Sequence, residues 1–256
     1  MRPNEGMLPV IQQVIEDCTG QVKWSGLNAL EYLKTSTELA SSHPELSAFS
    51  AICAEEEAAA CLIHSIKALK YPEAKKIRFT SHPHKHAVFV FIRNVVDWFQ
   101  AHQSITDWPF RSPVFQVKPQ GERKAIHLVL PLKSMSLSVN PHPPLNFDVE
   151  GASTLESQLV EHMTLQMQTT KIEEVRKLIE KSANHRNLLL YADSKGLPKL
   201  SGDIDTFITV QTEKVAIMLT AVGLIDPWSK FPHSPIVITC ISLLLKFMDR
   251  TFPSEN

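Results

Sequence analysis

Apolar residues recur at intervals of three or four positions along most of this chain, which is the period of an α-helix with one buried face. Prolines and glycines follow several of these stretches, and neither residue continues a helix well. The fourth stretch is long for one helix, and the pair Thr169-Thr170 predicts a kink within it. We expect helices over residues 26–40, 45–70, 86–102, 153–193, 202–222 and 235–250.

The helical period is interrupted between residues 107 and 151, where prolines are frequent. Residues 113–117 and 125–130 form two short apolar stretches separated by a Pro-Gln-Gly-Glu turn, which predicts a β-hairpin. Residues 137–139 predict a third short strand. The sequence therefore predicts a mainly α fold, a single helical-bundle domain over residues 1–256, with a small antiparallel β-hairpin insertion at 107–151.

Composition and charge narrow the class of protein. Hydrophobic residues make up 43% of the chain, enough for a packed core, and only 8 glycines are present, which favours helices over a turn-rich β fold. The net charge of −1 predicts no overall cationic surface for nucleic acid, although it does not bear on a single cleft. Four cysteines without a CxxC pair predict free thiols in a reducing cytoplasm.

Two further features predict a soluble protein without a membrane. The N-terminal residues contain no apolar core of a signal peptide. The most apolar run, residues 235–245, is shorter than the ~20 residues that cross a bilayer. We expect this run to form a buried core helix or a contact between subunits.

Glu56 occupies an unusual position in the second expected helix. With 100° per residue, Phe49, Ile52, Ala59 and Ile63 fall within about 40° of the centre of the apolar face, and Glu56 falls among them. An ionised carboxylate cannot be buried alone, because it needs a cation, a hydrogen-bond donor or a proton. The sequence therefore predicts a partner for Glu56.

Arg186 is the candidate partner. It lies near the end of the long fourth helix, beside three consecutive leucines, and on a helix Asn187 and Tyr191 would crowd the same side. An arginine that faces the bundle there suits a buried Glu56. Such a pair serves either a chemical role or an ordinary structural one that holds two helices together.

A histidine-rich segment follows the second helix. His82, His84 and His86 alternate with other residues, so in an extended segment they would point the same way and could converge on zinc. No cysteine or HExxH pattern adjoins them, and we name no metal ligand and no cofactor. The alternatives are a solvated cationic loop and a segment that contacts RNA or a partner, for which Lys85 supplies charge.

Several short motifs occur here in a recognisable order. Residues 54–58 read Ala-Glu-Glu-Glu-Ala, a His-Lys-His segment and the β-insertion follow, and residues 186–193 read Arg-Asn-x-x-x-Tyr-x-Asp before a Gly-Leu-Pro step. In this order the chain resembles the AbiV-type (abortive infection) branch of the HEPN superfamily. The similarity covers residues 27–198.

The resemblance implies a fold and an activity. HEPN domains are small helical bundles that often dimerise, and many are metal-independent endoribonucleases of toxin–antitoxin and anti-phage systems. It implies RNA as substrate, a homodimer, and an antitoxin or another defence protein as partner. By this resemblance Arg186 would stabilise the charge on the phosphate, Asn187 is the residue that often follows that arginine, and Glu56 or Glu57 would orient Arg186.

The chain departs from the family motif at one position. The motif places histidine four to six residues after the arginine, and Tyr191 stands there instead. A tyrosine with a pKa near ~10 is a poor general base at neutral pH, whereas histidine accepts and returns a proton readily. Either Tyr191 only orients, or another histidine contributes, or the chain is a non-catalytic interaction module with a structural Glu-Arg-Tyr network. The candidate histidines are His82, His84, His86 and His185.

Overall fold

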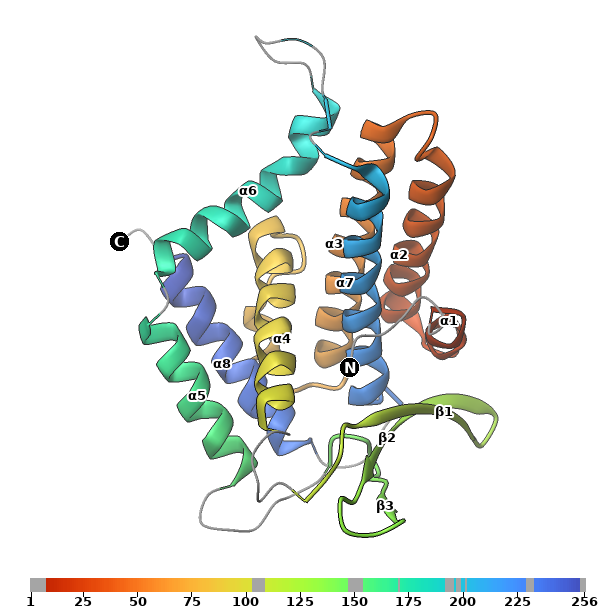
Figure 1. Cartoon of the computed structure of the whole chain (residues 1–256), viewed down its shortest axis with the longest axis vertical. Helices are drawn as coiled ribbons and strands as arrows, with labels where there is room; N and C mark the ends of the chain where they lie inside the picture. The colour runs from red at the N-terminus through yellow and green to blue at the C-terminus, as the bar shows by residue number, and fades with distance from the viewer. Residues whose placement is uncertain are drawn as a thin grey trace.

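The computed structural model confirms a mainly α fold with a small antiparallel sheet (Figure 1). It describes residues 8–102, 109–146, 154–169, 171–191, 196, 199–200, 202–228 and 233–253. Both ends of the expected insertion (107–108 and 147–151), together with residues 193, 197 and 198 of the family motifs, lie outside this part. The helices are α1 (Leu8–Glu16), α2 (Gly20–Leu39), α3 (Pro44–Ala68), α4 (His82–His102), α5 (Leu155–Thr169), α6 (Ile172–Leu190), α7 (Ile204–Ile225) and α8 (Pro235–Thr251), with a short 3₁₀ turn, η2 (Ala74–Lys76).

Two of the expected helices differ in a way that matters for the site. Helix α4 begins at His82, so the histidine-rich segment is its first turn and not an extended strand. Pro83 is tolerated there because a residue in the first turn needs no backbone N–H for a helical bond. The long stretch at 153–193 contains two separate helices, of which α5 ends at Thr169 and α6 begins at Ile172. Helix α1, which buries Ile11, Val14 and Ile15, was not expected.

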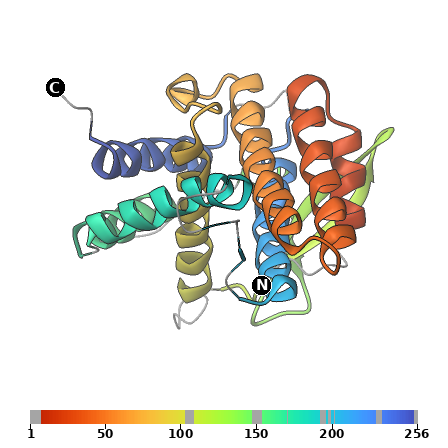
Figure 2. The same ribbon diagram turned by 90° about the horizontal axis from the view of Figure 1, so that it is seen from above.

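Helix α3 lies in the centre of the bundle. It packs against α2 and α7 on one side and against α4 and α6 on the other, and the views from the front and from above agree on this arrangement (Figures 1 and 2). Most of α3 is buried, and its alanines let the neighbouring helices approach closely. Helices α5 and α8 complete the bundle beside α4, while α6 crosses α4 near its first turn (Figure 2).

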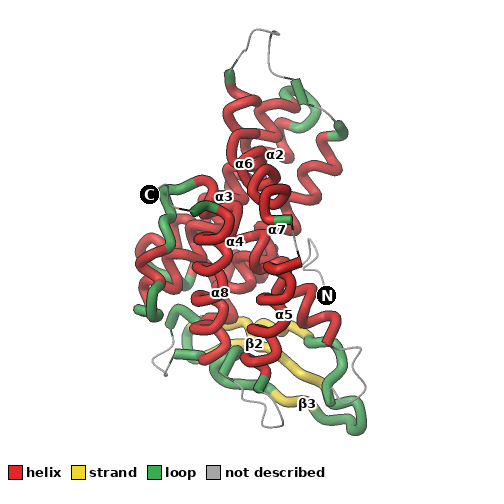
Figure 3. The backbone as a smooth tube through the Cα atoms, turned by 90° about the vertical axis from the view of Figure 1, so that its left-hand side faces the viewer, coloured by secondary structure: helices red, strands yellow, loops and turns green. Residues whose placement is uncertain are grey.

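The sheet lies at one end of the bundle (Figure 3). Strands β1 (Val114–Gln120) and β2 (Arg123–Pro131) form the expected hairpin, in register from Val114 opposite Val129 to Gln120 opposite Arg123, and β3 (Ser138–Val139) adds the short third strand. The turn uses Gly121 at a φ of +64°, a conformation that favours glycine.

Two contacts fix the sheet to helix α7. Gly223 lets β2 approach, since a Cβ at this position would stand 2.5 Å from the Ile126 side chain. Arg123 donates from Nη1 to Asp226 Oδ1 at 2.7 Å and from Nη2 to Asp226 Oδ2 at 3.2 Å, just beyond the end of α7. The β-insertion is therefore packed against the bundle, at the end where α7 terminates.

Helix α7 is long and apolar enough to cross a membrane by length and composition alone. Half of its apolar stretch is buried inside the fold, and it carries Lys214, whose ammonium pairs with a buried carboxylate of α3. These are features of a core helix. The expectation of a protein without a membrane partner stays a prediction.

Candidate functional site

Two adjacent carboxylates lie buried at the middle of helix α3. Glu55 is 2% exposed and Glu56 is 3% exposed. Basic side chains from α4, α6 and α7 surround them, and together they form what we call the charged cluster. Its members are Glu55, Glu56, His82, Lys85, His86, Arg186 and Lys214.

The predicted contact between Glu56 and Arg186 is present, although 130 positions separate the two residues. Arg186 Nη1 donates to Glu56 Oε2 at 3.4 Å, and Lys85 Nζ lies 3.8 Å from the same oxygen. His82 Nδ1 lies 2.7 Å from Glu56 Oε1. Helices α4 and α6 thus bring cationic or hydrogen-bonding groups to one buried carboxylate, as the physics of burial requires.

Glu55 has its own partners. His86 Nδ1 lies 3.0 Å from Oε1, and Lys214 Nζ donates to Oε2 at 2.8 Å. Burial raises the pKa of Glu55, but the charge of Lys214 and the hydrogen bond from His86 outweigh it and lower the pKa to about 2. The carboxylate therefore stays ionised at neutral pH in spite of its burial.

The charged cluster contains more permanent cations than carboxylates. Three permanent cations (Lys85, Arg186 and Lys214) face two carboxylates. The side chains of His82 and Arg186 are 37% and 30% exposed, and His82 Nε2 lies 3.4 Å from Arg186 Nη2. An approaching molecule would meet a guanidinium beside an imidazole, with the carboxylates behind them. That arrangement suits a phosphate.

Tyr191 does not join the charged cluster. Helix α6 ends at Leu190, so Tyr191 lies beyond it with an extended backbone and a side chain 68% exposed. The expectation that Arg186, Asn187 and Tyr191 share one side of a helix is therefore wrong for Tyr191. Asn187 is exposed on the last turn, where its carbonyl accepts the N–H of Tyr191.

Three other expected site residues lie elsewhere. Glu57 is half-buried and lines a groove between α2 and α7, so Glu56 and not Glu57 meets Arg186. His84 Nδ1 accepts the backbone N–H of Arg78 at 3.1 Å, while burial and then the charge of Arg78 lower its pKa. His185 packs against the Phe207 ring, and burial lowers its pKa.

The histidines of α4 diverge instead of converging on a metal. In the first turn of a helix, residues four apart share a face, so His82 and His86 both reach the carboxylates whereas His84 points elsewhere. Within the described ranges, no group of three or more His, Cys, Asp or Glu side chains could hold a metal ion. The alternation that suggested zinc depended on an extended segment, which α4 replaces.

Two members of the charged cluster were missed from the sequence. The sequence singled out only Glu56 on the apolar face of the second expected helix, yet Glu55 is buried as well, because neighbouring helices cover α3 on nearly all sides. Lys214 is half-buried in α7 and follows Glu213 directly, so a partner on the same helix was as plausible from the sequence as Glu55 of α3.

Comparison with known proteins gives no information about the role of the charged cluster. No family model matches the chain, and neither a curated protein nor a solved structure matches it. Membership of the AbiV-type branch of the HEPN superfamily stays a prediction from short motifs. The function is therefore argued from the charged cluster.

Proposed function

We propose that the charged cluster cleaves RNA through the 2′-hydroxyl group, with His82 as general base and Arg186 as the phosphate ligand. The observation that carries this proposal is the chain of contacts from Glu56 through His82 to Arg186. A carboxylate that holds one ring nitrogen of a histidine orients the other nitrogen for proton transfer. The arginine beside it can stabilise the charge that develops on the phosphate.

The two ring nitrogens of His82 have different roles in this proposal. We assign the Nδ1 proton to the 2.7 Å hydrogen bond with Glu56, which leaves a lone pair on Nε2. In the free protein that lone pair faces Arg186 Nη2 at 3.4 Å. A phosphate that binds the guanidinium would draw it away and free Nε2 for the substrate hydroxyl.

The reaction then balances with these groups alone. His82 Nε2 takes the proton of the 2′-hydroxyl, the 2′-oxygen attacks phosphorus, and the bond to the 5′-oxygen breaks. The imidazolium returns the proton to the departing 5′-oxygen. The products are a 2′,3′-cyclic phosphate and a 5′-hydroxyl end, and His82 is regenerated as the neutral base.

His82 lies beside Arg186, as the histidine of the family motif is expected to, although it comes from another part of the sequence. The motif takes its histidine from the helix of the arginine, whereas here the imidazole next to Arg186 comes from the first turn of α4. We propose that this histidine replaces the one missing at position 191. With the resemblance, this supports a cytoplasmic effector of stress response or phage defence that acts as a homodimer beside an antitoxin or another defence protein.

The test is RNA cleavage by the purified chain in the presence of EDTA. We expect cyclic-phosphate ends from wild type, and losses of at least ~10²-fold in rate for His82→Ala and Arg186→Ala. His84→Ala, in the same turn, and Arg176→Ala, on the same helix as Arg186, are matched controls that should cleave normally. Tyr191→Phe should also cleave normally. Equal rates for wild type and Arg186→Ala would refute the proposal.

A second candidate function is a non-catalytic interaction module in which the charged cluster only orders the helices. The observation that favours it is the depth of the cluster, since Glu55, Glu56 and His86 are all 3% exposed or less. In that case His82→Ala and Arg186→Ala would lower thermal stability, and wild type would leave RNA intact. Growth arrest on expression of wild type, relieved by Arg186→Ala at equal protein level, would speak against this second candidate.

A further inference from the structure

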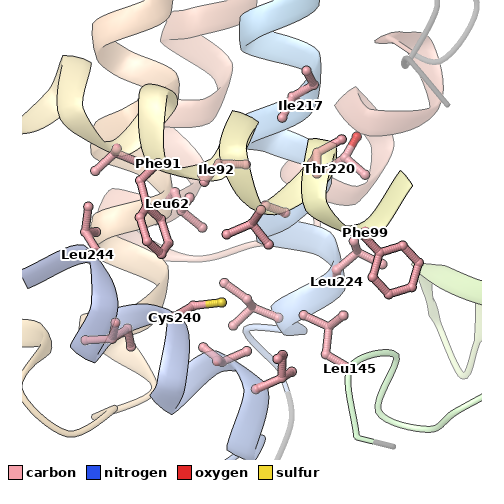
Figure 4. Close-up of a pocket in the computed structure, with 18 of the residues that line it drawn as sticks. Leu62, Phe91, Ile92, Phe99, Leu145, Ile217, Thr220, Leu224, Cys240 and Leu244 are labelled. Atoms are coloured by element: carbon pink, nitrogen blue, oxygen red, sulfur yellow. The ribbon is translucent and has the colours of Figure 1, made fainter. Parts of the chain in front are cut away.

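A cavity of about 280 Å³ lies in the core, away from the charged cluster and towards the sheet (Figure 4). Protein interiors contain few voids larger than a water molecule. An apolar cavity of about 150 Å³ is already large enough to hold benzene. The present cavity has roughly twice that volume, so it is large enough for a ligand and too large to be ordinary packing.

The wall of the cavity is almost wholly apolar. Leu62 of α3, Phe91 of α4, Leu224 of α7, Leu244 of α8 and Leu128 of β2 all line it (Figure 4 labels four of these side chains), and β1 and α5 contribute further apolar side chains. None of the described side chains that line it carries a charge. The cavity therefore suits a neutral, apolar molecule and offers no counter-ion for a carboxylate or phosphate head.

One polar group on this wall has no partner. Thr220 is 3% exposed, and its hydroxyl oxygen has no hydrogen-bond partner among the described residues. Threonines inside helices usually bond to the carbonyl four positions earlier. Thr37, Thr209 and Thr251 of this chain do so, with their Oγ1 atoms 2.7–3.1 Å from that carbonyl. Thr220 does not, although it is buried, and it lies on the wall of the cavity.

We infer that the cavity binds one neutral molecule with a single aliphatic chain of about eight to ten carbons and one hydroxyl or carbonyl oxygen. The chain would fill the apolar volume, and the oxygen would bond with the Thr220 hydroxyl. Several lining residues, Phe99 and Leu145 among them, are only half-buried, so a ligand can reach the cavity from the surface. This site shares no residue with the charged cluster, so the outcome of its test does not depend on the RNA-cleavage proposal.

The probe is 1-octanol, added to the full chain and followed by calorimetry and by thermal shift. We expect one saturable site and a rise in melting temperature. Leu224→Trp fills the cavity and should weaken binding at least tenfold, while Leu178→Trp, a matched change at an exposed leucine of α6, should leave it unchanged. Should Leu224→Trp fail to fold, Cys240→Met on the α8 wall is a smaller filler that should weaken binding about threefold.

The role of Thr220 has its own test. Thr220→Val keeps the shape of the side chain and removes the hydroxyl. It should weaken 1-octanol about fivefold, as loss of one hydrogen bond predicts, and leave the thermal shift by n-octane unchanged. Absence of saturable 1-octanol binding, or equal binding by the filled and unfilled variants, would overturn the site. Equal affinity of Thr220→Val and wild type for 1-octanol would overturn the assigned contact.

Discussion

The charged cluster and the apolar cavity share three helices. Helices α3, α4 and α7 run in the same direction (Figure 1), so Glu55, His86 and Lys214 meet at the level of the middle of α3, and Leu62, Phe91 and Leu224 meet further along (Figure 4). In the cluster, each buried carboxylate has several partners. In the cavity, the buried hydroxyl of Thr220 has no hydrogen-bond partner within the described part of the chain.

The two regions differ in how strictly they require particular partner atoms at particular positions. A buried charge is so costly that it requires particular partners at particular atoms, and helix positions become fixed around it. An apolar wall makes no such demand, because dispersion contacts are weak individually and have no direction. The fold can therefore leave a volume between apolar side chains for a ligand, but it cannot leave Glu56 without a cation.

The largest expected effect comes from removing one of the two carboxylate charges. Glu56→Gln keeps the shape of the side chain but leaves Arg186 and Lys85 without their carboxylate. We expect the free energy of unfolding, measured with urea, to fall by about 3–5 kcal/mol. The control is Glu31→Gln, which removes an exposed carboxylate 3.8 Å from Lys34 and should cost less than about 1 kcal/mol. Similar losses for the two variants would contradict the view that the cluster specifies the bundle.

Acid should weaken the charged cluster before it affects the cavity. The pKa of Glu55 is about 2 in the folded chain, below its ordinary value of 4.5, so the unfolded chain binds more protons between these values. Its contribution to stability is complete above pH 4.5 and is lost as the pH falls towards 2. The shift corresponds to about 3 kcal/mol.

The measurement is the free energy of unfolding against pH, in wild type and in Glu55→Gln. The variant should be less stable at neutral pH, and its stability should fall less steeply between pH 4.5 and pH 2. Glu31→Gln should retain the slope of wild type. A slope for Glu55→Gln that equals the wild-type slope would show that Glu55 is not held ionised by Lys214 and His86.

The same contrast explains what could be predicted from the sequence. The contact of Glu56 with Arg186 was predictable because a charge within an apolar stripe demands a partner. The positions of His82 and His86 were not, since nothing local distinguished an extended segment from the first turn of a helix that contains Pro83. Tyr191 was misplaced because the end of α6 at Leu190 depends on the chain that follows and not on the leucines before it.

The fold was predictable for a related reason, and the cavity was not. Helical periodicity and the Pro-Gln-Gly-Glu turn are local signals, and they located the hairpin and most of the helices, although α1 was not expected and α5 and α6 were expected as one helix. Which apolar side chains leave a space between them depends on how several helices and strands meet. No single position in the sequence carries that information. In the sequence Thr220 does not differ from other helical threonines, and only the structure shows that its hydroxyl has no hydrogen-bond partner among the described residues.

The smallest expected effect comes from adding volume at the cavity wall, compared with the same change in the rest of the core. Ala221→Val adds two methyl groups at the cavity wall, where space exists, and should raise the free energy of unfolding by about 1 kcal/mol, measured with urea. Ala59→Val makes the same change at a fully buried, closely packed position of α3 and should cost about 1–3 kcal/mol. The two variants share the same loss of helix propensity, so the opposite signs isolate packing. If both variants destabilise the chain equally, the cavity is closed in solution, and the apolar end of these helices is packed as tightly as the centre of α3.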